Sequence, residues 1–203
     1  MSPVAPKPQR MRPLEPAVVA FGSNLGDREA TIRAALDDLA STPGVRLDAV
    51  SSLHETAALR LDGVDQDAPR YLNGIALISA ALDPHALLDE LHRIEDANGR
   101  VRVERWGDRT LDLDLIAMGG RYVDDETLVL PHPRAAEREF VLAPWLDVDP
   151  DAELPGLGRV DVLLERVRAS ASADSGTGPG AGAEAVGRSS DAEPDGSGEG
   201  SRS

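Results

Sequence analysis

The order of the apolar periodicities between residues 17 and 118 most constrains the fold of this chain. Two amphipathic segments with helical spacing alternate with short segments that are apolar or that alternate in polarity. Strands are expected at 17–26, 45–55, 71–82 and 109–118, and helices at 27–42 and 83–99. The order strand–helix–strand–strand–helix–strand is that of the split βαβ unit, an antiparallel sheet with helices packed on it. We therefore predict an α+β fold, a ferredoxin-like βαββαβ sandwich with short C-terminal elements.

Local signals indicate where these elements begin and end. Pro43 and Gly44 close the first helix, whereas Asp83 is a suitable N-cap for the second. Residues 56–70 have no clean period and predict a long loop. The later elements are expected to be a short extended piece at 121–125, a loop through 130–134, a helix that ends at the proline at 144, and an amphipathic helix at 159–168.

Composition limits the folded part and the classes of partner. The proline-rich arm 1–15 and the Gly/Ser/acidic tail 169–203 are predicted to be disordered, which leaves 16–168 as one domain. The net charge of −15 disfavours binding to nucleic acid, and no apolar run is long enough to span a membrane. The chain has no cysteine and no apolar signal segment, so a cytoplasmic protein is expected.

The string "LDLDL" at 111–115 places two carboxylates inside an apolar run. Because successive strand residues point to opposite faces, Thr110, Asp112 and Asp114 share one face and the leucines share the other. A solvated strand face is the common explanation of such a pattern. However, two like charges this close on a strand repel each other, and a bound magnesium ion with oxygen ligands would remove that cost.

An arginine-rich segment precedes these carboxylates. It contains Arg100, Arg102, Arg105 and Arg109. Guanidinium groups next to carboxylate-bound magnesium are typical of a polyphosphate site. The alternative is a solvated loop whose arginines pair with neighbouring acids. Trp106 in the same segment suits stacking on a ligand or closure over it, and its alternative role is to anchor the loop.

Aromatic residues make up only 3% of the chain, so each one is a candidate for contact with a flat ligand. Tyr71 and Asn73 share a strand face, and the amide of Asn73 can both donate to and accept from a heterocycle. Phe140 offers a second stacking surface. His132 is held between two prolines and is followed by Arg138, although lone histidines are more often structural.

Several strings together resemble the 6-hydroxymethyl-7,8-dihydropterin pyrophosphokinase family. They are "FGSNLGD" (21–27), "YLNG" (71–74), "RIED..GRVRVERWGDRTLDLDL" (93–115), "LPHPR" (130–134) and "REFVLAPW" (138–145). The resemblance covers roughly 18–160 and implies the same ferredoxin-like fold. It also implies a monomer that transfers the terminal diphosphate of ATP to the pterin hydroxymethyl group, releasing AMP, in folate (tetrahydrofolate) biosynthesis with two Mg²⁺ ions.

The resemblance further implies roles for individual residues. Asp112 and Asp114 are expected to bind the metal ions and, together with Arg100 and Arg109, to be catalytic. The expected ATP-site residues are Glu95, Arg102, Arg105, Trp106, Arg109, Leu115, His132 and Arg138. The expected pterin-site residues are Thr56, Leu59, Tyr71, Asn73, Trp106 and Phe140.

The chain departs from the family pattern after Thr56. Two alanines, 57–58, stand where the family usually has proline, and the segment 56–70 is longer than expected. The aromatic partner of Phe140 is therefore left open, and His54 is the nearest ring-bearing candidate.

The residues alone also leave two rival functions. The first is a ferredoxin-like regulatory module that binds a nucleotide without catalysis. The second is a metal-dependent nucleotidyltransferase or nuclease with a D-x-D pair, which the acidic net charge and the single lysine, Lys7, disfavour.

Overall fold

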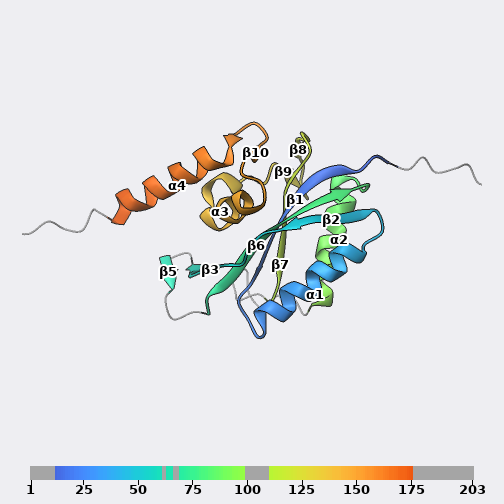
Figure 1. Ribbon diagram of the computed structural model, residues 1–203, viewed down its shortest axis with the longest axis horizontal. Helices are drawn as coiled ribbons and strands as arrows, with labels where there is room; N and C mark the ends of the chain where they lie inside the picture. Colours follow the sequence, from blue (N-terminus) through green and yellow to red (C-terminus); the bar gives the residue numbers. More distant parts are fainter. Residues whose placement is uncertain (1–11, 61–62, 66–68, 99–109, 176–203) are drawn as a thin grey trace, which may run out of the picture.

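A computed structural model describes residues 12–60, 63–65, 69–98 and 110–175 of the chain. Its centre is an antiparallel sheet with strand order β2-β6-β1-β7, which crosses the middle of the molecule in Figure 1. The four strands are β1 (Glu15–Ser23), β2 (Val45–Val50), β6 (Tyr71–Ala80) and β7 (Asp112–Met118). With two helices at the predicted places between them, they confirm the βαββαβ order and the α+β fold class.

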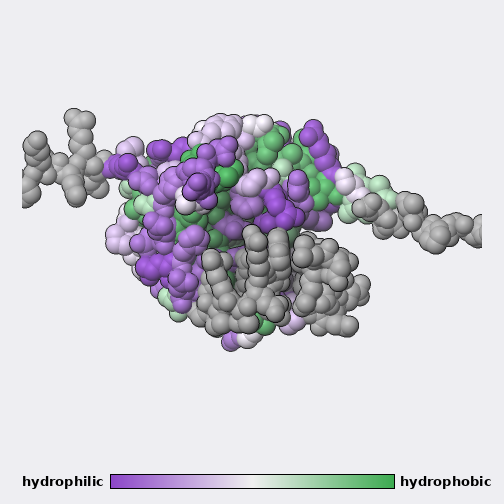
Figure 2. Space-filling view, turned by 180° about the vertical axis from the view of Figure 1, so that it is seen from behind, coloured by the Kyte–Doolittle hydropathy of each residue, from purple (hydrophilic) through white to green (hydrophobic). Residues whose placement is uncertain are grey.

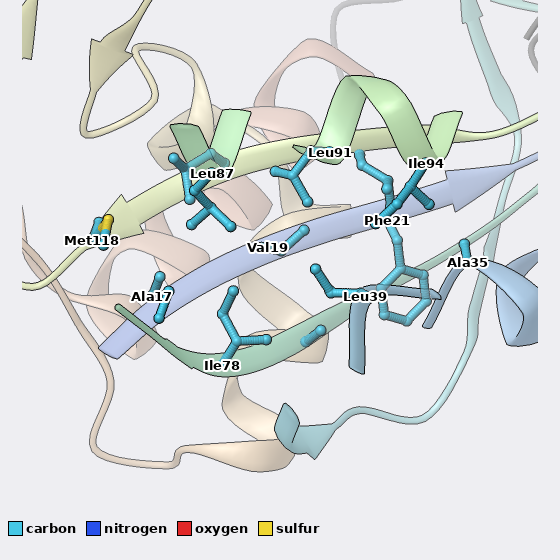
Figure 3. Packing of buried hydrophobic residues seen from close by; sticks show 14 of the residues in the cluster. Ala17, Val19, Phe21, Ala35, Leu39, Ile78, Leu87, Leu91, Ile94 and Met118 are labelled. Atoms are coloured by element: carbon cyan, nitrogen blue, oxygen red, sulfur yellow. The ribbon is translucent and has the colours of Figure 1, made fainter. Parts of the chain in front are cut away.

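Helices α1 (Arg28–Ser41) and α2 (Pro84–Ala97) cover one face of the sheet. Asp27 and Asp83 cap them, each accepting a hydrogen bond from the backbone N–H three residues on. The stripe Leu87, Leu91 and Ile94 of α2 is fully buried against the sheet, as Figure 3 shows. Each such side chain stabilises the fold by about 1.5–3 kcal/mol, so this first core holds the α1/α2 layer on the sheet.

The opposite face of the sheet carries a second core under α3 (Glu139–Val148) and α4 (Val160–Ser175). The short 3₁₀ turn η1 (Ala135–Glu137) precedes α3 in the chain. The prediction that the third helix ends at Pro144 is wrong. Leu142 and Trp145 on either side of the proline are buried, and this packing offsets the missing backbone hydrogen bond. α4 also runs seven residues past its predicted end at 168.

Two further differences concern the edge of the sheet. The predicted strand 45–55 is split, because the Ser51 hydroxyl accepts the Ile75 N–H at 2.9 Å and so interrupts the ladder. The chain then resumes pairing with β6 as β3 (His54–Thr56). The predicted loop 56–70 contains a small hairpin of β4 (Ala58–Arg60) and β5 (Gly63–Asp65). Two more hairpins join β8 (Val123–Asp124) to β9 (Val129–Leu130) and β10 (Glu153–Leu154) to β11 (Gly158–Arg159).

The surface of the described residues is mixed in polarity. Hydrophilic and hydrophobic residues are interspersed on the face shown in Figure 2, which is usual for a protein surface. Among the helices of the described segments, none combines the length and the hydrophobicity needed to cross a bilayer.

Candidate active site

Residues on four neighbouring strands form a row across one end of the sheet. Asp112 of β7 pairs with Gly22 of β1, which in turn pairs with Asn73 of β6. Asn73 also pairs with His54 of β3 on its other side. Because directly paired residues of an antiparallel sheet point to the same face, the row presents a carboxylate, an amide and an imidazole together.

The second carboxylate lies one step inward on the same face. Asp114 pairs with Ala20, which pairs with Ile75, and these two apolar residues belong to the second core under α3. Leu113 and Leu115 are buried in the first core, on the α1/α2 side. The predicted division of this strand into a leucine face and an aspartate face is therefore confirmed, and the aspartates face the side of α3.

Gly22 keeps the middle of the row open. A Cβ atom at this position would lie 2.8 Å from Oδ1 of Asn73, which is closer than real Cβ contacts come. The neighbouring Ser23 is buried, and its hydroxyl donates to the backbone oxygen of Thr110 at 2.6 Å, which fixes the start of β7 beside β1. Glycine and serine in the string "FGSN" thus place the carboxylate and the amide on the same face of the sheet, on either side of β1.

Arg138, just before α3, links the carboxylates to an aromatic ring. One of its guanidinium nitrogens donates to Oδ2 of Asp114 at 3.3 Å, and both side chains are mostly shielded from solvent, with exposures of 22% and 35%. The guanidinium carbon also lies 5.5 Å from the centre of the Phe140 ring, within cation–π range. Arg138 therefore connects the strand face that carries the two carboxylates with a surface suited to a flat ligand.

His132 lies on the same side of the sheet. Its backbone N–H donates to the carbonyl of Ile116 at 2.8 Å, and its Nδ1 accepts the N–H of Arg134 at 3.2 Å. Burial lowers the pKa of the His132 imidazole, and the nearby carboxylate of Asp114 partly opposes that shift. With Nδ1 accepting, a neutral His132 presents Nε2–H as a hydrogen-bond donor.

Glu95 and Leu115, both predicted to lie near ATP, have side chains on the α1/α2 side of the sheet. Glu95 is only 1% exposed, and its Oε1 accepts the backbone N–H of Leu113 at 2.8 Å. This bond anchors β7 at the residue between the two aspartates, from the α1/α2 side of the sheet. Whether Glu95 and Leu115 contact the nucleotide stays a prediction.

A second cluster lies at the β3 end of the row. The amide nitrogen of Asn73 donates to Oγ1 of Thr56 at 2.7 Å, and Thr56 pairs with Tyr71 across the two strands. Beyond Thr56 lies an open cavity of about 530 Å³, a size common for small-molecule sites. Its lining consists of Leu53, His54, Glu55, Thr56, Ala57, Arg70, Glu139, Phe140, Ala143 and Arg168.

The aspartate pair is the most suitable place for a metal ion. Among the described residues there is no group of three or more histidine, aspartate or glutamate side chains that could hold one. Magnesium needs less, because it keeps several waters and binds through one or two carboxylates together with substrate phosphates. Asp112 and Asp114 thus fit a magnesium ion that arrives with a nucleotide.

Six of the predicted site residues cannot be placed in this arrangement. Arg100, Arg102, Arg105, Trp106 and Arg109 lie outside the described residues, as does the side chain of Leu59. The structure brings together seven others on one side of the sheet, namely Asp112, Asp114, His132, Arg138, Asn73, Thr56 and Phe140.

The sequence reasoning missed several residues around the cavity. Asp147 bonds to His54 at 2.8 Å although the two are 93 positions apart, and Arg168 bonds to Glu139 at 2.7 Å. No local pattern signals such long-range pairs. The need for glycine at 22 likewise depends on the packing of Asn73 from the neighbouring strand.

Comparisons with known proteins identify a family of similar sequences. The model of the 7,8-dihydro-6-hydroxymethylpterin-pyrophosphokinase family matches residues 18–150. The 2-amino-4-hydroxy-6-hydroxymethyldihydropteridine pyrophosphokinase of Methylorubrum extorquens is 42% identical over 140 residues, which are 69% of this chain and 86% of the relative. The protein of the same name from Pseudomonas aeruginosa is 44% identical over 137 residues, covering 68% and 82% of the two chains.

Solved structures support the fold independently. The chain is similar to Plasmodium falciparum HPPK-DHPS, solved with pterin and p-hydroxybenzoate, with a TM-score of 0.60 at 13% identity. The similarity covers 82% of this chain but only 45% of that one, so this chain spans less than half the length of the solved protein. At this identity the likeness shows the fold alone.

Proposed function

We propose that this chain, which belongs to the 7,8-dihydro-6-hydroxymethylpterin-pyrophosphokinase family, transfers the terminal diphosphate of ATP to 6-hydroxymethyl-7,8-dihydropterin. AMP and the pterin diphosphate are the products, and the reaction belongs to folate biosynthesis. The observation that carries the proposal is the shared sheet face on which Asp112 and Asp114 lie beside Asn73, with Arg138 reaching from Asp114 to Phe140.

The aspartate end of this face is assigned to ATP. Asp112 and Asp114 would hold magnesium, with two ions expected from the family, and the bound metal would neutralise phosphate charge and favour attack at phosphorus. His132, with its Nε2–H donor, and the cationic Arg138 are suited to phosphate oxygens. Arg100 and Arg109 are proposed to neutralise the charge that develops on AMP and the transferred diphosphate.

The other end of the face is assigned to the pterin. The amide of Asn73 is almost completely buried at 7% exposure and is oriented by Thr56, so it can recognise the edge of a heterocycle. The ring of Phe140 offers a stacking surface for a flat heterocycle, and the Arg138 guanidinium carbon lies 5.5 Å from the centre of that ring. Leu59, Tyr71 and Trp106 complete the proposed pterin site.

The reaction on this face is a displacement at the β-phosphorus of ATP. The pterin hydroxymethyl oxygen forms a bond to that phosphorus and loses its proton, while the bond to the bridging oxygen breaks and AMP leaves with that oxygen. Positioning the two substrates and neutralising their charge provide most of the catalysis in reactions of this type. The protein is proposed to act as a cytoplasmic monomer.

The test is to incubate the protein with ATP, MgCl₂ and 6-hydroxymethyl-7,8-dihydropterin and to separate the nucleotides by chromatography. We expect AMP and a pterin diphosphate in equal amounts, and neither product when MgCl₂ is replaced by EDTA. Formation of ADP, or binding of ATP without turnover, would overturn the proposal and favour the nucleotide-binding regulatory module.

A further inference from the structure

Three side chains join β3 to the end of α3 beside the cavity. The carboxylate of Asp147 accepts a hydrogen bond from the hydroxyl of Ser52 and lies 2.8 Å from Nε2 of His54 through the same oxygen, Oδ2. The Oγ atom of Ser52 lies 3.3 Å from Nε2 of His54. We refer to Ser52, His54 and Asp147 as the β3–α3 latch.

The charged pair of the latch is partly shielded from solvent. The side chains of His54 and Asp147 are 32% and 35% exposed, less than those of most ion pairs on this surface. A hydrogen bond from Ser52 and, to a smaller extent, one from His54 lower the pKa of Asp147. The carboxylate is therefore the charged acceptor at neutral pH. A charge-assisted bond in this setting holds two elements together more firmly than a fully exposed pair does.

The arrangement does not suit a nucleophilic relay. In such a relay the aspartate bonds to one imidazole nitrogen and the hydroxyl to the other. Here the hydroxyl and the carboxylate both meet Nε2 of His54, and they also bond to each other. The contacts therefore fix positions, and they do not activate Ser52.

The two elements that the latch joins both line the cavity. On α3, Phe140 and Ala143 line the cavity, and Asp147 follows them at helical spacing on the same side. On β3, His54 and Thr56 line it. Figure 1 shows β3 beside α3.

β3 needs such support because it is short. It has three residues and, within the described part of the chain, pairs with β6 alone. Short edge strands with few backbone bonds open most readily. Yet this strand carries Thr56, which orients the amide of Asn73 at 2.7 Å.

We propose that Asp147 is a positioning residue that, through Ser52 and His54, sets the width of the cavity between β3 and Phe140 and thereby the affinity for the second substrate. This inference rests on the proposed function, since the second substrate is the pterin. Loss of the latch releases β3 from α3, so the orientation of Thr56 and Asn73 relative to the Phe140 ring is no longer fixed. The nucleotide end of the face, held by β1, β7 and Glu95, stays in place.

The test compares four variants of the full chain. In Asp147→Ala and His54→Ala, we expect KM for the pterin to rise about fivefold to tenfold, the range of one partly exposed charge-assisted bond, with KM for ATP unchanged. His54→Gln keeps an N–H donor and should restore much of the affinity. His85→Ala is the matched control, because His85 on α2 makes the same 2.8 Å bond to Asp125, outside the cavity lining.

Hydrogen exchange gives a second measurement that does not depend on turnover. Amides of residues 53–57 should exchange faster in Asp147→Ala than in the wild type, whereas those of β1 and β7 should not change. The inference is overturned if the wild type makes AMP and Asp147→Ala has an unchanged KM for the pterin. It is also overturned if the variant has a lower kcat and equally raised KM values for both substrates. If the wild type makes no AMP, the proposed function fails, and unchanged exchange at 53–57 then overturns the latch as well.

Discussion

Replacing Gly22 with alanine tests the row of site residues at its most crowded point. The new Cβ would lie 2.8 Å from Oδ1 of Asn73, whereas ordinary contacts begin at 3.4 Å. The amide must therefore retreat by about 0.6 Å, enough to take its 2.7 Å hydrogen bond to Thr56 beyond the usual range of about 2.7–3.2 Å. Because the obstacle is the end of a side chain, the strand itself can stay in place.

The cost of this shift can be estimated. Loss of one largely buried amide–hydroxyl hydrogen bond costs about 1–2 kcal/mol, which corresponds to a fall of about fivefold to thirtyfold in kcat/KM for the pterin. KM for ATP should not change, because the three atoms nearest the new Cβ belong to Asn73, Leu72 and Tyr71, and none of them belongs to Asp112. The melting temperature should fall by only a few degrees.

The assay is steady-state AMP formation with each substrate varied in turn. Gly120→Ala serves as the matched control, because no atom lies within 4 Å of a Cβ there and its backbone needs no glycine. If Gly22→Ala keeps kcat/KM for the pterin, or weakens ATP and pterin equally, the proposed side-by-side placement of the two substrates is refuted.

Three further predictions concern other parts of the molecule. Asp114→Ala should abolish magnesium-dependent AMP formation while the circular dichroism spectrum is kept, and near-normal AMP formation would exclude the role given to this carboxylate. Hydrogen bonds from Ser79 and Arg46 lower the pKa of Asp48, so this group stabilises the fold above the ordinary aspartate pKa of about 4 and loses that effect as the pH falls toward its lowered value. Asp48→Asn should therefore flatten the decline of the unfolding free energy in urea below about pH 4, and an unchanged decline would contradict this origin. A chain that ends at residue 175 should keep wild-type kinetics. A chain that ends at residue 167 lacks the cavity-lining Arg168, and its KM for the pterin should be about twofold to fivefold higher. Equal kinetics of the two truncated chains would refute a role for the end of α4.

The regular part of the fold could be predicted because its signals are local. The alternation in "LDLDL" and the leucine stripe at 87–94 each fix which side of an element is buried, and the structure confirms both. Helix capping by Asp83 is equally local. The aspartate face could be predicted for the same reason, since the period of a strand decides it without knowledge of the neighbours.

The parts that could not be predicted depend on distant contacts. The break in the ladder at Ser51 arises from one hydroxyl that replaces a backbone acceptor for Ile75. The helix continues through Pro144 because burial of its neighbours outweighs a local propensity against helix. The bond from Asp147 to His54 joins positions 93 residues apart, and only the packing of α3 on the sheet brings them together.

The fate of the phosphates tests the central claim most directly. The reaction should be run with ATP labelled at the γ-phosphorus and, separately, at the α-phosphorus, together with MgCl₂ and the pterin. The account predicts that the γ label appears in the pterin diphosphate and the α label in AMP. Release of the γ label as orthophosphate, or an α label recovered in ADP, would contradict diphosphate transfer by this site.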